Sequence, residues 1–373
     1  MVKRHYFLGT AAGFSKKWRV MMRKGKGHHE DYVALQEYLV KEYGGRQAIP
    51  LINGRSAIAA ILANYRECVW GDGGEVIING FTCRAVVQGV KAAGFIPAYA
   101  DIDRGTLNFT VESLEKVLTP QTRAVIVQNT LGNMVDIEAV EKFCRKHKLV
   151  LIEDLAHCAG RFYADGREAG KVGAAVAFSF GKEKSIDVCG GGAVVFRDPK
   201  MPLMSEPCGE PDDKAEFRAR IYPTIGYIYR GLSYVHLSGV FMRLMLKTGL
   251  VRRSAEGEVD YKKVPLGDFQ AKMALAQLKK RGKLAKRPLR EFYLVRDRDE
   301  VLRKLASAGY YFGGFWYEKP VSPERYYKKV HFPEKECPEA VWVSEHIVNL
   351  PNYYTEKELA EVRRIIKEYE EAE

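Results

Sequence analysis

The sequence has few cysteines, and none of them are arranged to cross-link the chain or hold a metal. Seven cysteines occur among 373 residues, an odd number, and no two form a Cys-x-x-Cys pair. Disulfide frameworks and zinc modules are built from paired, closely spaced cysteines, so the sequence argues against both. The cysteine usage therefore favours a reducing compartment and predicts no metal site.

Long apolar runs are also missing. No stretch approaches the ~20 consecutive apolar residues that a membrane-spanning helix needs, and the chain before Lys16 has no sustained apolar core. We therefore expect neither a spanning helix nor a cleaved secretory signal, and we expect a cytoplasmic protein. Hydrophobic residues make up 46% and charged residues 28%, proportions typical of a globular protein with one large and one smaller domain.

Acidic residues are absent from two segments, and these carry the whole excess of positive charge. The chain has 59 lysines and arginines against 47 aspartates and glutamates, a formal net charge of +12. Residues 1–29 hold eight of the bases and residues 217–255 hold seven, and neither segment contains an acid. Without those 15, 44 bases face 47 acids, a balance of −3. The basic segments contain no nucleic-acid-binding motif, so nucleic acid is not an expected partner.

The second acid-free segment, residues 217–255, is also unusually apolar. Read as a helix, it places Arg230, Arg243 and Lys247 roughly on one side, while apolar residues such as Leu246 follow another face. A wide apolar face accompanied only by positive charges is typical of a helix that lies on an anionic membrane. A helix buried at a subunit interface, with its arginines meeting phosphate or acidic groups, fits the same pattern, and both interpretations stay open.

The first half of the chain alternates between short apolar runs and amphipathic stretches. A helix is expected over residues 29–44, where a glycine pair would end it. A short apolar run lies at residues 48–52. Runs that read as strands lie at residues 75–79, 96–100, 124–128, 149–153 and 193–196. Helices are expected from residue 57 and over residues 84–93, 111–118 and 137–147. This alternation predicts an α/β fold, a mostly parallel sheet with helices on both faces.

Past residue 198 the order changes. Helices are expected over residues 269–278, 283–308 and 356–370, the second of them long and highly charged, with short strand-like pieces before the last. We therefore expect a large domain over residues 1–250 and a smaller α+β domain over residues 251–373.

Four spots fall at or just beyond strand ends, where ligands of open α/β sheets bind. At the first, Gly54, Arg55 and Ser56 follow Asn53 in a turn that opens a helix. Exposed backbone N–H groups and the helix dipole at such a turn suit a phosphate group. The same residues also serve as an ordinary helix cap.

The second spot holds two consecutive acids, Glu153 and Asp154, at the end of an apolar strand. A buried carboxylate is costly unless it has a fixed cationic or N–H partner. Asp154 is placed to hold a protonated heterocyclic nitrogen, and His157 lies about one helical turn further on. A helix N-cap followed by a buried, hydrogen-bonded histidine is the alternative interpretation.

The third spot is a glycine-rich turn that contains lysines. Residues 178–184 read FSFGKEK, and CGGG follows just before a strand. A lysine in an apolar setting loses basicity and becomes a candidate for Schiff-base chemistry. Lys184 is the candidate for this chemistry. The alternative is a solvated lysine on a loop, an interpretation that applies to Lys182 above all and also to Lys184. The fourth spot, residues 128–130, ends a strand with polar side chains and is equally consistent with a plain turn.

Taken in order, these motifs resemble the DegT/StrS family of sugar aminotransferases, which are pyridoxal-phosphate (PLP) enzymes of fold type I. The resemblance runs over residues 54–198 and continues more weakly to the C-terminus. It is carried by GDGGEVIINGFTC, PAYADIDRGTLNFTVESLEKVLTPQTRAVIVQNTLG, LIEDLAHCAG, SFGKEKSIDVCGGG, FQAKMALAQL and ECPEAVWVSEHIVNLPN. It implies a large PLP-binding domain, a smaller C-terminal domain and a homodimer whose active sites lie at the subunit interface.

The resemblance also implies roles for the site residues. Lys184 stands where the family's lysine binds the cofactor covalently and later moves a proton, and Asp154 where an acid pairs with the pyridinium nitrogen. His157 takes the position usually held by a glutamine near the O3′ atom of the cofactor. Phosphate contacts are implied for Gly54, Arg55, Ser56 and Ser179.

Three departures from the family's pattern make a less common substrate plausible. Cys83 occupies the position where an aromatic ring normally stacks on the cofactor, so packing there is thinner or supplied by Phe81. Lys263 falls where an asparagine of the partner subunit usually reaches the phosphate, which a lysine could do electrostatically. Asn129 replaces the usual histidine at its strand end.

The function implied by the resemblance is transfer of an amino group from glutamate, or a similar donor, to a keto-sugar that is usually nucleotide-linked. The basic segments would suit the diphosphate of such a substrate. A PLP-dependent deoxysugar dehydratase and a membrane-docked, non-catalytic member of the fold are the alternatives. In one dehydratase branch a histidine replaces the lysine, so Lys184 favours transamination. The presence of Lys184 together with Asp154 and Ser179 counts against a non-catalytic scaffold.

Overall fold

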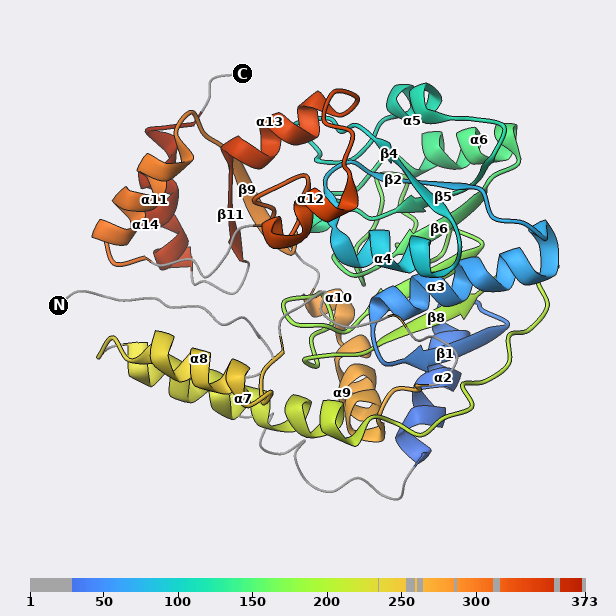
Figure 1. Ribbon diagram of the computed structural model, residues 1–373, viewed down its shortest axis with the longest axis horizontal. Coiled ribbons are helices and arrows are strands. Elements are labelled where there is room, and N and C mark those ends of the chain that lie inside the picture. Colours follow the sequence, from blue (N-terminus) through green and yellow to red (C-terminus); the bar gives the residue numbers. More distant parts are fainter. Residues whose placement is uncertain are drawn as a thin grey trace.

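A seven-stranded sheet forms the centre of the protein, which is represented by a computed structural model (Figure 1). The structure describes residues 29–233, 235–252, 259, 264–284, 287–310, 316–351 and 356–370. The strand order is β1-β8-β7-β6-β5-β2-β4. The strands are β1 (Gln47–Leu51), β2 (Glu75–Asn79), β4 (Ile96–Ala100), β5 (Thr122–Val127), β6 (Val150–Asp154), β7 (Ala175–Ser179) and β8 (Gly192–Phe196). All neighbouring pairs from β4 to β7 are parallel, and β8 is antiparallel to both β7 and β1. The predicted mostly parallel α/β sheet is confirmed.

Each face of the sheet is covered by its own layer of helices. In β2, Ile77 packs into one hydrophobic cluster, whereas Val76 and Ile78 pack into the other. Helices on the first side are α2 (Glu30–Tyr43), α5 (Val111–Val117), α6 (Ile137–His147) and α9 (Asp268–Leu278), and on the second α3 (Gly54–Tyr65) and α4 (Arg84–Ala92). Because both faces are buried, the strands show no polar alternation, which is why they read as continuous apolar runs.

A smaller α+β unit follows in the chain. Strand β9 (Arg290–Leu294) pairs antiparallel with β11 (Ile347–Pro351), and α11 (Arg298–Ser307) and α14 (Glu356–Lys367) pack with them around a separate hydrophobic cluster. A short parallel pair, β3 (Thr82–Cys83) with β10 (Val321–Ser322), joins this part of the chain to the edge of the large sheet domain. The remaining elements are α10 (Arg281–Leu284), α12 (Tyr327–Val330), α13 (Pro338–His346), a π-helix at Arg66–Trp70 and 3-10 turns at Thr130–Gly132 and Glu324–Tyr326.

The long helix expected over residues 283–308 is wrong. In the described part of that stretch the chain forms the end of α10, the strand β9 and the helix α11. Pro288 has no backbone N–H to continue a helix, and residues 290–294 pair in register with residues 347–351. Charged residues surround this short strand on both sides, which made it resemble part of a charged helix.

The place where the smaller unit begins stays a prediction. Helix α9 packs on α2 and shares the hydrophobic cluster of the sheet, through Phe269 and Met273 among others. The separate cluster of the smaller unit is formed by side chains between Tyr293 and Ile366. The division expected between residues 250 and 251 is not tested by these contacts, and we propose that the smaller unit begins nearer β9.

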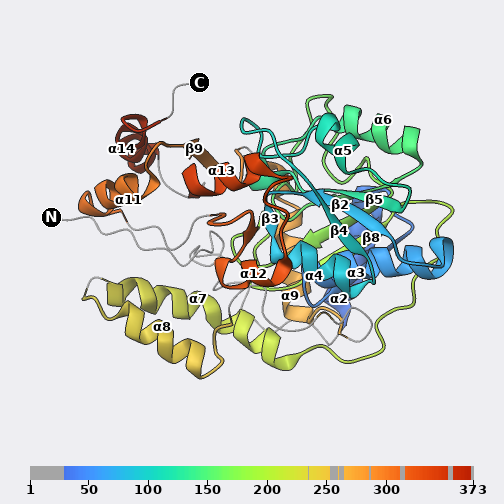
Figure 2. The same cartoon turned by 45° about the horizontal axis from the view of Figure 1, so that its top comes forward.

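Most of the described part of the acid-free segment 217–255, together with residues 213–216 before it, forms a helical hairpin that projects from the body (Figures 1 and 2). Helix α7 (Asp213–Ser233) runs out from α9, and α8 (Ser238–Lys247) packs back along it. Within the described residues, no helix combines the length and the hydropathy that crossing a bilayer requires. The other acid-free segment, residues 1–29, lies outside the described residues except for His29.

Candidate functional site

Lys184 lies on the loop between β7 and β8, at the carboxyl end of the parallel strands. Its Nζ atom is 3.0 Å from Nε2 of His157 and 4.5 Å from the centre of the Trp316 ring. Burial lowers the pKa of the Lys184 ammonium from its ordinary value, and this outweighs the opposite influence of Cys83 and Asp154. A lower pKa increases the fraction of neutral amine, which is the nucleophilic form.

The partners of His157 fix which ring nitrogen carries the proton. The backbone N–H of Leu131 donates to Nδ1 over 3.1 Å, so Nδ1 is an acceptor and the proton of the neutral ring is on Nε2. Burial lowers the pKa of His157 well below its ordinary value, and the neighbouring basic groups of Lys184 and Arg290 also disfavour a charged imidazole. The ring is therefore neutral at pH 7. The Nε2–H group points at Lys184 Nζ, which accepts this hydrogen bond only as an uncharged amine.

A strained turn holds the Leu131 N–H against His157. Asn129 and Leu131 both have left-handed backbone conformations, with φ of 52° and 56°, which is uncommon for residues other than glycine. The Asn129 side chain stabilises the turn, because it accepts a hydrogen bond from Val135 N–H at 2.9 Å and donates one to Tyr163 Oη at 3.1 Å. The polar residues 128–130 thus build the turn behind the site.

Of the two consecutive acids at the end of β6, Glu153 has a structural role. Its carboxylate is fully buried. It accepts hydrogen bonds of 2.6–2.9 Å from Tyr163 Oη and from the backbone N–H groups of Gly170, Val172 and Gly173. These four donors stabilise the charge that burial would otherwise disfavour.

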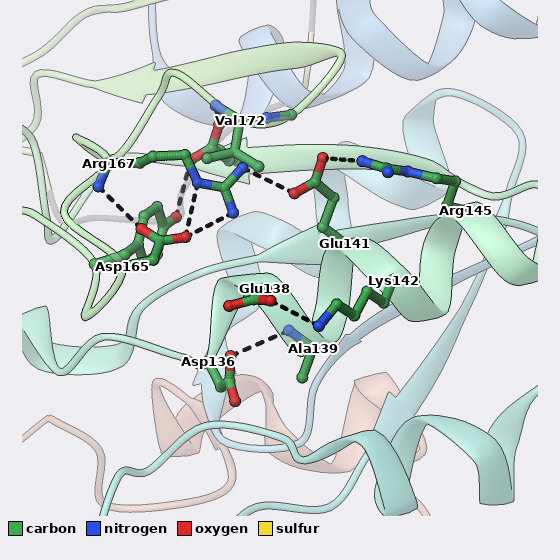
Figure 3. Close-up of polar contacts among 12 residues, drawn as sticks. Asp136, Glu138, Ala139, Glu141, Lys142, Arg145, Asp165, Arg167 and Val172 are labelled. Carbon is green, nitrogen blue, oxygen red and sulfur yellow. Dashed lines mark hydrogen bonds and ion pairs between the residues drawn. The ribbon is translucent and has the colours of Figure 1, made fainter.

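Replacing Glu153 with glutamine is expected to lower the free energy of unfolding by about 3 kcal/mol, because an amide NH₂ would face buried N–H donors and leave them unsatisfied. Urea unfolding of the two proteins measures the difference. Glu138→Gln is the matched control, since Glu138 is exposed and forms an ion pair with the exposed Lys142, at 2.6 Å on α6 (Figure 3). Such exposed pairs contribute about 0.5 kcal/mol or less, so equal losses in both variants would contradict the role given to Glu153.

Asp154 faces the site, and few partners stabilise the negative charge of its carboxylate. It is 5% exposed, and its Oδ1 accepts one hydrogen bond, 2.9 Å long, from the Ala156 N–H. Burial raises the pKa of Asp154 to about 6, although that hydrogen bond and the charge of Lys184 act to lower it. A cation placed against this carboxylate would stabilise its charged form. Asp154 therefore suits a protonated ring nitrogen.

The turn at the start of α3 lies against the end of β7. Asn53 caps the helix by accepting a 2.9 Å hydrogen bond from Ser56 N–H, and Ser56 is fully buried. A Cβ atom on Gly54 would lie 2.6 Å from Ser179 Cβ, so only glycine allows this approach. Arg55 extends to Gln88, with Nη1 3.3 Å from its Oε1 atom, and burial lowers the pKa of Arg55. The helix N-terminus and the Ser179 hydroxyl together suit an anion such as phosphate.

Cys83 lies at the edge of the same site. It caps α4 by accepting a hydrogen bond from the Ala85 N–H at 3.5 Å through its sulfur. Its thiol is close enough to influence the pKa values of both Lys184 and Tyr317.

Of the predicted site residues only Lys263 lies outside the described residues. Among the residues that the structure describes, no group of three or more histidine, cysteine or acidic side chains could hold a metal ion.

Three residues of the site were missed in the sequence. The Trp316 ring stacks on His157, with ring centres 5.2 Å apart. The Arg290 guanidinium lies 4.4 Å above the same Trp316 ring and donates to Asn349 Oδ1 at 2.9 Å and to Glu183. The Oη atom of Tyr317 is buried and finds no hydrogen-bond partner among the described residues. All three come from the smaller unit, and no local motif in the sequence marked them.

The chain is similar in sequence to known proteins over about half of its length. The profile of the DegT/DnrJ/EryC1/StrS aminotransferase family matches residues 12–230. A pleiotropic regulatory protein of Geobacillus stearothermophilus is 32% identical over 183 residues, 48% of this chain and 48% of the relative. GDP-perosamine synthase of Caulobacter vibrioides is 30% identical over 191 residues, 50% of this chain and 49% of the relative. The chain thus spans about half the length of the curated relatives it matches.

A solved structure shows the same fold over nearly the whole chain. Helicobacter pylori PseC, an aminotransferase involved in the biosynthesis of pseudoaminic acid, superimposes with a TM-score of 0.62 at 20% sequence identity. The superposition covers 99% of this chain and 99% of PseC.

The side chains of the site fit the cofactor of this family. Asp154 suits the protonated ring nitrogen, Lys184 suits a covalent link, and the Gly54 turn beside Ser179 suits the phosphate. The buried Tyr317 hydroxyl without a partner is the expected sign of a bound polar molecule, since leaving it unpaired is costly. The family profile also covers more than half of the sequence. The chain belongs to the DegT/DnrJ/EryC1/StrS aminotransferase family, and its cofactor is pyridoxal 5′-phosphate.

Proposed function

We propose that this protein transfers an amino group from an amino acid, glutamate or a similar donor, to a keto-sugar in nucleotide-linked form. The observation that carries the proposal is the contact between Lys184 and His157, 3.0 Å apart, beside the buried acid Asp154. PLP, when bound, supplies a ring that accepts the electrons released when a substrate Cα–H bond breaks.

Lys184 has two tasks in this reaction. Its neutral Nζ atom would hold the cofactor covalently. Once released by the amino group of the donor, the same Nζ would act as the general base that takes the proton from Cα of the donor and as the acid that gives it back. In the opposite direction, with a ketone as substrate, the same atom would serve amination of the acceptor.

The residues around Lys184 keep each proton in place. Asp154 would hold a positive charge on the ring nitrogen, which would supply the cation that its buried carboxylate lacks. The Nε2–H group of His157, fixed beside Lys184, would offer a hydrogen-bond donor to the cofactor. Trp316, which lies against His157 and Lys184, and the buried Tyr317 add aromatic surface that would limit access of water to the site.

The acceptor class rests on the relatives. One matched relative is GDP-perosamine synthase, and PseC is an aminotransferase involved in the biosynthesis of pseudoaminic acid. Both relatives support a sugar acceptor for this chain. A deoxysugar dehydratase is the second candidate on the same scaffold, and the presence of Lys184 favours transamination over it.

We also propose a homodimer that works in the cytoplasm, with a peripheral contact to anionic membrane. All seven cysteines are free thiols, which supports a reducing compartment. The homodimer is supported by the family resemblance, which assigns Lys263 to the partner's phosphate site. The exposed apolar and basic residues of the α7–α8 hairpin support the membrane contact.

Mixing the PLP-loaded protein with glutamate tests the first half of the reaction. The visible band of the lysine-linked cofactor is expected to disappear as 2-oxoglutarate forms, and a panel of keto-sugar nucleotides should restore it, with the amino-sugar detected by mass. Loss of water from the sugar, without use of the amine donor, would favour the dehydratase instead. No response of the band to any amine would contradict the proposal.

A further inference from the structure

The outer faces of the hairpin expose large apolar side chains at its tip and along α8. Exposed fractions are 72% for Tyr227, 59% for Val235, 52% for Leu237, 56% for Val240 and 52% for Leu244. Single exposed apolar residues are common on soluble proteins, but several of them gathered on one projecting hairpin mark a contact surface.

These side chains are not the ones that hold the hairpin together. On α8, Met242 and Met245 face α7, where they pack with Tyr222 and Ile225. Val240 and Leu244, one turn apart, remain exposed on another side of the helix. Helix α8 is therefore apolar on two sides, and internal packing accounts for only one of them.

The charges of the hairpin identify its partner. Arg243 and Lys247 are exposed and lie on the same side of α8 as Leu244, and no acid occurs anywhere in residues 217–255. The surface therefore complements an anionic partner. A second copy of the chain, related by a two-fold axis, would bring cations against cations at this surface.

We propose that the tip of the α7–α8 hairpin docks on the surface of a lipid bilayer that contains anionic lipids. Tyr227, Leu237 and Val240 lie toward the tip, and Lys247 lies at the far end of α8. This order matches a bilayer surface, where the apolar tip enters the interface and the cations behind it meet the headgroups.

The base of the hairpin contacts the loop that carries Lys184. Lys182, two residues earlier on that loop, has Nζ 4.2 Å from the centre of the Tyr222 ring of α7. The same Nζ donates a 2.9 Å hydrogen bond to the backbone carbonyl of Arg252, just beyond α8. Docking would therefore hold the site at a fixed orientation to the membrane. A fixed orientation favours an acceptor that is supplied or consumed at the membrane surface, and this inference about the acceptor rests on the proposed function. The docking itself does not depend on the proposed function.

Co-sedimentation of the PLP-loaded protein with vesicles tests the proposal. Binding is expected to vesicles of phosphatidylcholine with about 30% phosphatidylglycerol at low salt, to weaken as salt is added, and to be absent with phosphatidylcholine alone. The double variant Val240→Ser, Leu244→Ser should lower the partition coefficient about tenfold, because it removes two exposed apolar side chains from the outer side of α8. Arg243→Gln with Lys247→Gln should also weaken binding about tenfold and reduce its salt dependence.

Matched controls lie at the base of the same hairpin. Phe217 is 54% exposed near the start of α7, and Lys214 is exposed one turn earlier. Phe217→Ser and Lys214→Gln should leave binding unchanged. Failure of the wild-type protein to sediment at low salt would overturn the proposal, as would equal losses in the controls. Loss of self-association, rather than vesicle binding, in the tip variants would show that a second copy occupies the surface.

The visible cofactor band of each variant is recorded in the same samples. A retained band shows that the variant is folded and loaded, since the substituted side chains are exposed. Because sedimentation requires no substrate, a failure of docking leaves the amine-transfer measurements intact, and a failure of amine transfer leaves docking testable.

Discussion

A Lys184→Ala variant is expected to transfer amino groups about 10⁴-fold more slowly than the wild-type protein, because one substitution removes both the covalent nucleophile and the proton-transferring base. Steady-state transfer from glutamate measures the loss. Borohydride reduction followed by peptide mapping provides a second readout. The wild-type protein should carry a cofactor adduct on Lys184, and the variant should carry none. Added methylamine should restore part of the rate, since a small amine can enter the space left by the side chain.

Lys182→Ala is the control for this prediction. Lys182 lies on the same loop, but its Nζ is directed to the Tyr222 ring and to the Arg252 carbonyl, away from His157. The adduct on Lys184 and most of the rate should persist in this variant. An adduct on Lys182, or a wild-type rate in Lys184→Ala, would contradict the site described here.

The sheet was predictable because burial on both faces leaves a strong local signal. The bounds of β2 and β4 agree with the expected strands at residues 75–79 and 96–100. Strand β7, Ala175–Ser179, was missed, although its neighbours were found. Two of its residues are alanine, which has low strand propensity, and its central position in the sheet decides its conformation.

The site residues that were predicted lie in local sequence motifs, whereas the missed ones are brought to the site by strand pairing between distant segments. Asp154 and His157 follow directly on a strand, and Lys184 lies at the next strand end, so the sequence order places them at one edge of the sheet. Trp316 and Arg290 reach that edge only because β3 pairs with β10 and β9 pairs with β11. Those pairings join segments far apart in the chain, and no local pattern predicts them. The error over residues 283–308 hid Arg290 as well, since it assigned that residue to a helix.

An Asp154→Asn variant is expected to lose amine transfer by at least about 10³-fold, because a neutral amide cannot hold the positive charge on the cofactor ring that makes it an electron acceptor. The amide oxygen can still accept the Ala156 N–H hydrogen bond, so the local fold should persist. Activity and cofactor retention are measured after loading with excess PLP. A variant within about tenfold of the wild-type rate would exclude Asp154 from the proposed role.

Although Asp154→Asn should lower the activity, it should raise the stability of the cofactor-free protein relative to the wild-type protein as the pH becomes alkaline. Burial raises the pKa of Asp154 to about 6 from an ordinary value of 3.8, so between these two values the folded protein binds more protons than the unfolded chain. The stability that this group contributes therefore falls as pH rises through that window, by about 3 kcal/mol in total.

Asparagine does not titrate and escapes this loss. Urea unfolding of the apoproteins at pH 4 and pH 8 should show the variant gaining on the wild-type protein by about 2.5 kcal/mol between the two conditions, since a small part of the loss falls below pH 4. Asp213→Asn, at an exposed carboxylate at the start of α7, should show no such gain. A stability difference that does not change with pH would mean that the Asp154 carboxylate already has a fixed cation in the empty protein, and that the cofactor ring is not the partner its burial demands.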